Sequence, residues 1–519
     1  MKLIEAINLD LAWKRLKKEI SGRNFVELPH EVDLMEIDLK QWFHSNLNKI
    51  ENERYNPGNI SVIDIPKPNF NIRAGAYLYP QDRLFYTALV GACYSSIYHA
   101  VKWSNNQIDF SYPMKSNDNM VEWLGSPFQS WSKFRNESLK KLEQGYDFVF
   151  VTDVSGFYDN IDLNGLTSDL KSCGCQDTVL KSLSLCLNRW AHVSGRGIPQ
   201  GHHASDILAK FYLNSVDLYL KDSGFTHLRY VDDIRVFCKS EDEAKRAIQR
   251  LTIILRKKGL NLQTSKSKIL SKDSAKKEIE GAVPELQELI QKYRISVLGE
   301  DDPYASLLEI DASFNPNDEV PKEVLEDAFE QFVGETFNKT LFHFLLKRLG
   351  KSKSLTAVPY CREALFRYPE ETETILEYVS DVGANSDFKD TFEFILANEN
   401  HLYPYQGYLI LKWFDHKTIT PEDSTLGCVR QICSNRKLPF YYRYYAIRIF
   451  GIHARYTDFE FLGSLYQEAE NIFEQAIILC AMKMIEKGKR NAFYTRAAFD
   501  GELQKRAIEL VKRLDAIAG

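Results

Sequence analysis

The chain has 519 residues, 44% of them hydrophobic and 26% charged, a composition typical of a globular protein of two or three domains. A formal net charge of −5 argues against a broad basic surface for gripping duplex nucleic acid, so any nucleic-acid site must be local. No apolar run reaches the roughly 20 residues of a membrane span. Nine scattered cysteines, an odd number, do not suit a closed disulfide framework. We therefore expect a cytoplasmic protein with reduced cysteines and no membrane partner.

The first twenty residues predict an amphipathic helix rather than a signal peptide. Leu3, Ile4, Ile7 and Leu11 stand at helical spacing, and acidic residues interrupt the apolar stretch.

Short strand-like runs alternate with helical stretches up to about residue 270. The runs are FVFV at 148–151, LRYV at 228–231 and IRVFC at 234–238. The helical stretches include 203–224 and 242–259, and the second ends on Gly259, a suitable C-cap. This order predicts an α+β fold, with helices packed against a small antiparallel sheet.

The rest of the chain predicts an all-helical second domain. Residues 271–303 are charged and weakly patterned, so we divide the chain into domains 1–285 and 286–519. Similar apolar helices then recur at 407–414, 444–451, 474–481 and 505–512, about 30 to 37 residues apart. That spacing is within reach of helical-repeat arrays, so we expect a HEAT-like stack, with an irregular helical bundle as the alternative.

Three aspartates stand at the ends of the apolar runs. Asp153 follows the run at 148–151, and the pair Asp232–Asp233 interrupts LRYVDDIRVFC. Each has a simpler explanation, since Asp153 could cap the next helix and an Asp pair could merely form a turn. If the three carboxylates converge, however, they need a cation to remain ionised side by side. Asp159 and Asp162, a little further on, fit better as helix-start or surface acids.

A glycine-rich loop lies between these acids. It reads GRGIPQGHHASDILAKFYLNSVD, in which Gly197 to Gly201 allow close backbone approach and Ser205 or Asp206 could cap the following helix. We expect His202 and His203 to pack or hydrogen-bond rather than bind metal, because no further ligand stands at suitable spacing.

The ordered set resembles the palm of reverse transcriptases over roughly residues 70–270. Asp153 fits the first motif, GIPQG at 197–201 the second, YVDD at 230–233 the third, and GLNLQTSKSKIL at 259–270 the fourth. RAGAYLYPQDRLFYTALV at 73–90 is similar to the fingers segment of bacterial reverse transcriptases.

The resemblance implies two-metal nucleotidyl transfer on deoxynucleoside triphosphates. Its catalytic residues would be Asp153, Asp232 and Asp233, which with the backbone of Val154 would hold Mg²⁺, or Mn²⁺ in its place. The nucleotide-binding candidates are Arg73 for the triphosphate, Tyr158 as the aromatic gate against a ribose 2′-hydroxyl, Gln200 beside the nucleotide, and Lys266 at the leaving pyrophosphate. A surface role for Lys266 is the alternative, and Lys133 and Arg135 are secondary triphosphate candidates.

The carboxy-terminal half of the chain narrows the resemblance. The Val-Thr-Gly signature of retron enzymes is absent, no zinc-finger nuclease or RNase H pattern comes after the palm, and the helical half replaces a standard thumb. The chain thus resembles the abortive-infection (Abi) reverse transcriptases of bacteria, most closely the P-two-type prophage form, with AbiK and AbiA as longer relatives. The expected fold is α+β fingers and palm without a standard thumb, followed by an all-α HEAT-like domain.

That resemblance implies a protein-primed, template-independent DNA polymerase acting in defence against bacteriophage. Its product would be single-stranded DNA attached covalently to the protein, and the enzyme would form homo-oligomers, trimers or larger. The priming tyrosine stays unassigned among 27 tyrosines. Two alternatives remain open: a templated RNA-dependent DNA polymerase, retron-like or intron-like, and a non-catalytic helical-repeat scaffold.

Overall fold

The computed structural model describes residues 2–23, 25–37, 55–281, 322–334, 336–397 and 402–518, together with 39, 46, 49, 50 and 52. The chain divides into two units. The first comprises Met1–Glu27, Glu31–Ile63 and Ala74–Ile279, and the second Leu28–His30, Asp64–Arg73 and Glu280–Gly519. The domain boundary expected at 285/286 lies outside the described residues.

The amino-terminal helix is broken, which the sequence pattern did not predict. It forms α1 (Leu3–Ala6) and α2 (Leu9–Arg23). The break falls at Asn8 because its side-chain oxygen accepts a hydrogen bond of 2.9 Å from the backbone N–H of Leu11, so that Asn8 caps the second helix.

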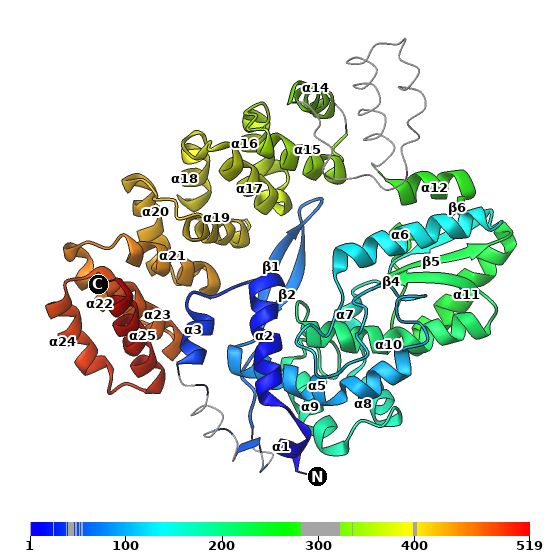
Figure 1. Cartoon of the computed structure of the whole chain (residues 1–519), viewed down its shortest axis with the longest axis horizontal. Helices are drawn as coiled ribbons and strands as arrows, with labels where there is room; N and C mark the ends of the chain where they lie inside the picture. Colours follow the sequence, from blue (N-terminus) through cyan, green and yellow to red (C-terminus); the bar gives the residue numbers. More distant parts are fainter. Residues whose placement is uncertain are drawn as a thin grey trace. The chain divides into compact units, whose positions relative to one another are not determined.

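A four-stranded antiparallel sheet forms the centre of the first unit (Figure 1). Its strands are β3 (Phe148–Thr152), β4 (Thr226–Tyr230), β5 (Asp233–Cys238) and β6 (Lys268–Ser271), in the order β4-β5-β3-β6. All three strands expected from the sequence are therefore present, and they pair with one another in the antiparallel sense.

Helices cover both faces of this sheet. Successive side chains of a strand point to opposite faces, so each strand contributes residues to two clusters. On one face Phe150, Ile234 and Val236 join the larger core, to which α10 (His203–Asp222) and α11 (Glu241–Lys257) contribute. On the other, Val149 and Phe237 pack against α6 (Pro127–Glu143) and α12 (Lys272–Glu280). Register places Asp153 and Asp233 on this second face, since they continue the alternation of Val149 and Phe237.

The remaining described elements of the first unit are α3 (Glu31–Glu36), α5 (Pro80–Val101), α7 (Phe157–Asn160), α8 (Leu163–Ser172), α9 (Asp177–Trp190) and the 3₁₀ turn η1 (Thr264–Lys266). The hairpin of β1 (Ser61–Lys67) and β2 (Asn71–Tyr77) is divided between the units, since residues Asp64–Arg73 belong to the second.

The second unit is largely helical (Figure 1). The described helices of one row each pack against the next: α15 (Lys339–Lys351), α17 (Thr372–Val382), α19 (Pro404–His416), α21 (Phe440–Ile452), α23 (Ile472–Ala481) and α25 (Glu502–Ala518). The intervening helices are α14 (Lys322–Val333), α16 (Val358–Arg367), α18 (Lys389–Ala397), α20 (Asp423–Ser434), α22 (Phe459–Gln467) and α24 (Lys487–Ala497).

The nine cysteines, all in the part of the chain that the structure describes, form no disulfide bond with one another. The Sγ atoms of Cys173 and Cys175 lie 3.7 Å apart. Within the described part of the chain, no helix is both long and apolar enough to cross a membrane.

Candidate active site

The two adjacent aspartates lie at a tight hairpin turn. Tyr230 of β4 pairs with Asp233 of β5, so Val231 and Asp232 form the two-residue connection. Val231 has a φ of 57°, in the left-handed region that a β-branched residue rarely adopts. Such a conformation costs about 1–3 kcal/mol and persists only where the surroundings impose it.

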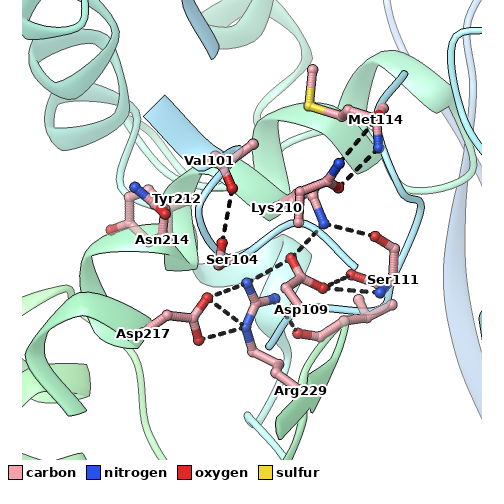
Figure 2. A network of polar contacts seen from close by, with 12 residues as sticks. Val101, Ser104, Asp109, Ser111, Met114, Lys210, Tyr212, Asn214, Asp217 and Arg229 are labelled. Carbon is pink, nitrogen blue, oxygen red and sulfur yellow. Dashed lines mark hydrogen bonds and ion pairs between the residues drawn. The ribbon is translucent and has the colours of Figure 1, made fainter. Parts of the chain in front are cut away.

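A buried ionic network imposes it (Figure 2). The Arg229 guanidinium donates 2.8 Å to the Val231 carbonyl, and its Nη2 lies 2.6 Å from Asp217 Oδ2 and 2.7 Å from Asp109 Oδ2. Lys210 completes the network, 2.8 Å from Asp109. These side chains are almost wholly buried, and burial alone would raise the pKa of Asp217, but Arg229 and His227 hold it at about 2.

The network also fixes the main chain below the turn. The Arg229 N–H donates to the Ile108 carbonyl at 2.8 Å, and the Phe110 N–H donates to the Arg229 carbonyl at 2.9 Å. The segment that follows α5 is therefore paired with β4. The strand β4, which leads into the turn, is thus hydrogen-bonded to this segment on one side and to β5 on the other. Sequence reasoning missed this network, for which the only signal was an arginine inside an otherwise apolar run.

The three aspartates lie together. Burial, followed by the charge of Asp153, raises the pKa of Asp232 to about 7. The same two causes raise the pKa of Asp233 to about 6, against the opposing charges of Lys266 and Arg235. The helix-cap alternative for Asp153 is wrong, because Gly156 stands at the N-cap of α7.

The fourth-motif segment, residues 259–270, is hydrogen-bonded to the first-motif residues around Asp153. Lys266 Nζ lies 2.5 Å from Asp153 Oδ2, and this hydrogen bond raises the pKa of Lys266. The Gln263 N–H donates to the Asp153 carbonyl at 2.7 Å, and the Ser155 N–H donates to the Asn261 carbonyl at 2.9 Å. Both bonds are made by the residues that flank Val154, which faces Leu262 across this short antiparallel bridge.

The donor set suits a magnesium ion, although its geometry is not that of a preassembled site. Among the described residues, no three His, Cys, Asp or Glu side chains already stand as a metal-binding group. Carboxylate oxygens are nevertheless the ligands that Mg²⁺ prefers. Burial and then the charge of Asp153 raise the pKa values of Asp232 and Asp233, and a bound cation would offset both effects. Asp153, Asp232 and Asp233 are therefore the residues that would hold it.

Tyr158 connects the first motif to the glycine-rich loop. Its ring is buried, its hydroxyl donates 2.7 Å to Asp206 Oδ1, and its carbonyl accepts 3.0 Å from the Ile198 N–H. Burial and then Asp206 raise the pKa of Tyr158 well above its ordinary value. The Gln200 carbonyl accepts 3.0 Å from the Ala76 N–H of β2.

Neither Ser205 nor Asp206 caps α10, contrary to expectation. His202 stands at the N-cap, and Ser205 Oγ instead lies 2.8 Å from the hydroxyl of Tyr86. The N-cap stands three residues before Ser205 and four before Asp206, so both side chains lie within the helix, where each bonds to a tyrosine. Asp162, by contrast, caps α8, accepting 2.7 Å from the Gly165 N–H.

The two histidines after the loop pair with a buried acid of α2. His202 Nδ1 lies 3.5 Å from Glu19 Oε1, and His203 Nδ1 lies 3.6 Å from Glu19 Oε2. Burial would raise the pKa of Glu19, but the two histidines and Arg83 outweigh it and lower the pKa to about 2. The histidines thus tie the loop to the amino-terminal helix by polar contacts with Glu19, and burial lowers the pKa of His202, which favours its neutral form.

The basic nucleotide-binding candidates are dispersed. Arg73 is exposed in β2 and belongs to the second unit, so the geometry of the first unit does not bring it to the aspartates. Lys133 is exposed and Arg135 half-buried, both on α6.

A cavity of about 270 Å³ opens beside the aspartates. It is lined by Trp131, Val151, Thr152, Asp153, Asp233, Ile234, Arg235, Ser265, Lys266, Lys268 and Glu278. Its position between α6, the strand ends and η1 gives access to two of the three carboxylates.

Comparisons with known proteins agree with this geometry. Residues 65–300 match the reverse transcriptase (RNA-dependent DNA polymerase) family, so the chain carries a reverse transcriptase domain. No curated protein matches the chain.

Similar solved structures include telomerases from Candida tropicalis. One, truncated from its carboxy-terminal domain, shares 15% identity over 45% of this chain and 55% of that chain, with a TM-score of 0.31. Another shares 13% identity over 95% and 78%, with a TM-score of 0.32. A partial Cas6-RT-Cas1–Cas2 complex shares 21% identity over 50% of this chain and 42% of that chain, with a TM-score of 0.28. The chain spans about half the length of the first and third of these, and TM-scores this low do not establish a common fold.

Proposed function

We propose that this chain, which carries the reverse transcriptase domain of a DNA nucleotidyltransferase, is a protein-primed, template-independent DNA polymerase of the abortive-infection type. The observation that carries the polymerase part is the convergence of Asp153, Asp232 and Asp233 at one edge of a braced sheet. Metal ions bound there would supply the charge that activates a 3′-oxygen and steadies the leaving pyrophosphate.

The surrounding side chains have distinct roles in this proposal. A metal ion held by the carboxylates would compete with Lys266 for Asp153 and so leave the Lys266 ammonium available to the pyrophosphate. Tyr158, held by Asp206, excludes a ribose 2′-hydroxyl, so the substrates are deoxynucleoside triphosphates. Gln200 lies in the loop beside the nucleotide.

Two features support synthesis without a template. Phe134 and Leu142 of α6 and Ala275 and Ile279 of α12 cover the sheet face that presents Asp153, so a nucleic acid would reach Asp153 through the small cavity beside α6. The net charge of −5 also fits an enzyme that holds one strand locally. The remaining parts of the proposal come from the Abi resemblance. A tyrosine would serve as primer, and the single-stranded DNA product would stay covalently attached to the protein. The enzyme would form oligomers of three or more subunits and act against phage in the cytoplasm. The stacked helices of the second unit support a HEAT-like array, for which we propose a role in assembly.

The test is incubation of the purified full chain with Mg²⁺ and labelled deoxynucleotides, without primer or template, followed by a denaturing gel. Label that stays with the protein and slows its migration is expected. The D153N and D232N variants should lose this label. D162N is the matched control, because the Asp162 side chain caps α8 and asparagine caps a helix about as well, so little stability should be lost.

The runner-up is a templated RNA-dependent DNA polymerase, favoured by the description of the matching family. Label that appears only with an annealed primer–template, and free of protein, would establish this activity instead. A non-catalytic scaffold would give no label under either condition.

A further inference from the structure

We propose that the growing DNA strand runs as a single strand along α6, with Trp131 and Arg235 holding the nucleotides next to its 3′ end. This inference rests on the proposed polymerase activity and adds a binding site for its product. The site, which we call the α6 track, consists of the cavity beside the aspartates and the outer face of α6.

Exposed aromatic side chains mark the outer face of α6. Phe128 is 81% exposed and Trp131 42%, unusual for large apolar side chains, and they stand one helical turn apart on the same face. The Trp131 ring is held edge-on against Tyr230 with ring centroids 4.9 Å apart. A fixed, exposed ring is suited to stack on a nucleobase, an interaction that tolerates any base sequence.

Arg235 supplies a half-buried positive charge in the cavity wall. Its Nη1 donates 2.8 Å to Ser138 Oγ, and its guanidinium lies 4.2 Å from the centre of the Phe134 ring. Asp233 and Glu278 act on it at longer range, but no carboxylate in the described part of the chain forms an ion pair with it. A desolvated guanidinium without a paired acid is a ready partner for a phosphodiester.

Arg135 extends this charge along the helix. It stands four residues after Trp131 and seven after Phe128, on the same face of α6. Its Nε is buried and, among the described residues, has no hydrogen-bond partner. An aromatic pair followed by a half-buried guanidinium on the same face gives alternating contacts for bases and backbone.

The charge of the cavity depends on metal binding. The cations Arg235, Lys266 and Lys268 are balanced by Asp153, Asp233 and Glu278. Lys268 forms an ion pair of 2.6 Å with Glu278. Divalent ions at Asp153 and Asp233 would free Lys266 from Asp153 and give the cavity a net positive charge. The DNA strand therefore binds best when the site is loaded for catalysis.

The dimensions favour one strand over two. A cavity of about 270 Å³ has room for part of one nucleotide chain and not for a base pair. It is backed by α6, and the track offers two guanidinium groups that form no ion pair with the described residues, far fewer phosphate contacts than binding of a duplex needs. Because Asp153 and Asp233 line the same cavity, a strand seated there ends at the carboxylates.

The test is fluorescence anisotropy of a labelled oligo-dT with the full chain carrying D232N, which keeps the protein free of DNA of its own making. W131A should weaken binding about tenfold through lost stacking. R235Q should weaken binding similarly at low salt and lower the slope of log K against log salt by about 0.7. W131F and R235K should recover part of each loss.

Matched controls are F499A and R513Q, which remove an exposed aromatic and an exposed arginine in the second unit. Wild-type affinity in W131A and R235Q, equal losses in the controls, or equal affinity for a blunt duplex of the same length would each overturn the α6 track. Because this titration needs no synthesis, it is separate from the self-labelling gel. A wild-type chain that fails to label itself refutes the proposed function, whatever the titration gives.

Discussion

The guanidinium of Arg229 donates a hydrogen bond of 2.8 Å to the carbonyl of Val231, the residue before Asp232. Val231 is held at a φ of 57°, and Arg229 is fixed by Asp109, 120 residues away in the chain, and by Asp217. The direction of the catalytic-candidate carboxylates is therefore set by a network outside the metal site. Arg229 is a positioning residue.

Arg229→Lys should lower kcat for nucleotide addition about a hundredfold with little change in the KM for nucleotide. Lysine keeps the charge beside the two buried acids but cannot supply the forked donors that reach both acids and the Val231 carbonyl. Arg229→Met should lose several kcal/mol of stability, because it leaves buried charges uncompensated. Steady-state kinetics and thermal melting separate the two effects, and a rise in KM alone for R229K would contradict the positioning role.

The metal-free protein should lose stability as the pH rises from about 4 to 8. The pKa of Asp232 is raised from 3.8 to about 7, so between these values the folded state binds a proton that the unfolded chain releases. The contribution of Asp232 to stability is full below pH 4 and is lost as the pH rises through about 7.

D232N should flatten this pH profile and raise the melting temperature of the metal-free protein at pH 8. Saturating Mg²⁺ should stabilise the wild type most at high pH, since it binds the ionised carboxylates. Melting curves from pH 5 to 8, with Mg²⁺ and with chelator, provide the measurement. Parallel profiles for the wild type and D232N would show that Asp232 does not carry the raised pKa.

Gly201→Ala should destabilise the protein by about 2–5 kcal/mol, combining left-handed strain with overpacking. Gly201 has a φ of 107°, and a Cβ there would lie 2.6 Å from ring carbons of Phe25. The control is Gly259→Ala, at a φ of 73° with nothing within 4 Å, which should cost only about 1–2 kcal/mol. Denaturant unfolding measures both, and equal losses would rule out the contact with Phe25 as the cause.

Two substitutions of Tyr158 should distinguish the role of its ring from the role of its hydroxyl. Y158F removes the hydrogen bond to Asp206, should cost about 1 kcal/mol of stability, and should keep the preference for deoxynucleotides. Y158V removes the ring and should raise ribonucleotide incorporation relative to deoxynucleotide at least tenfold. The measurement is the ratio of kcat/KM for ribonucleotides to kcat/KM for deoxynucleotides. An unchanged ratio in a folded Y158V protein would contradict the role of Tyr158 as a gate.

Local patterns determined a substantial part of this protein. Short apolar runs predicted the strands β3, β4 and β5. A strand that is buried on both faces of a sheet has apolar side chains at successive positions, and such a run can be recognised in the sequence. Aspartates at the ends of those runs, and glycines between them, were enough to anticipate the polymerase domain, since metal chemistry leaves carboxylates where packing alone would not. The broken amino-terminal helix was missed because a single asparagine cap outweighed the apolar spacing.

Only the tertiary structure decided how those aspartates are held. Arg229, Asp109 and Asp217 are far apart in sequence and look ordinary there, yet their buried charges must find one another because an isolated charge in the core is too costly. Trp131 and Arg235 likewise meet at one cavity only after α6 folds across the sheet. A sequence records which chemical groups are available, and long-range packing decides which of them face each other.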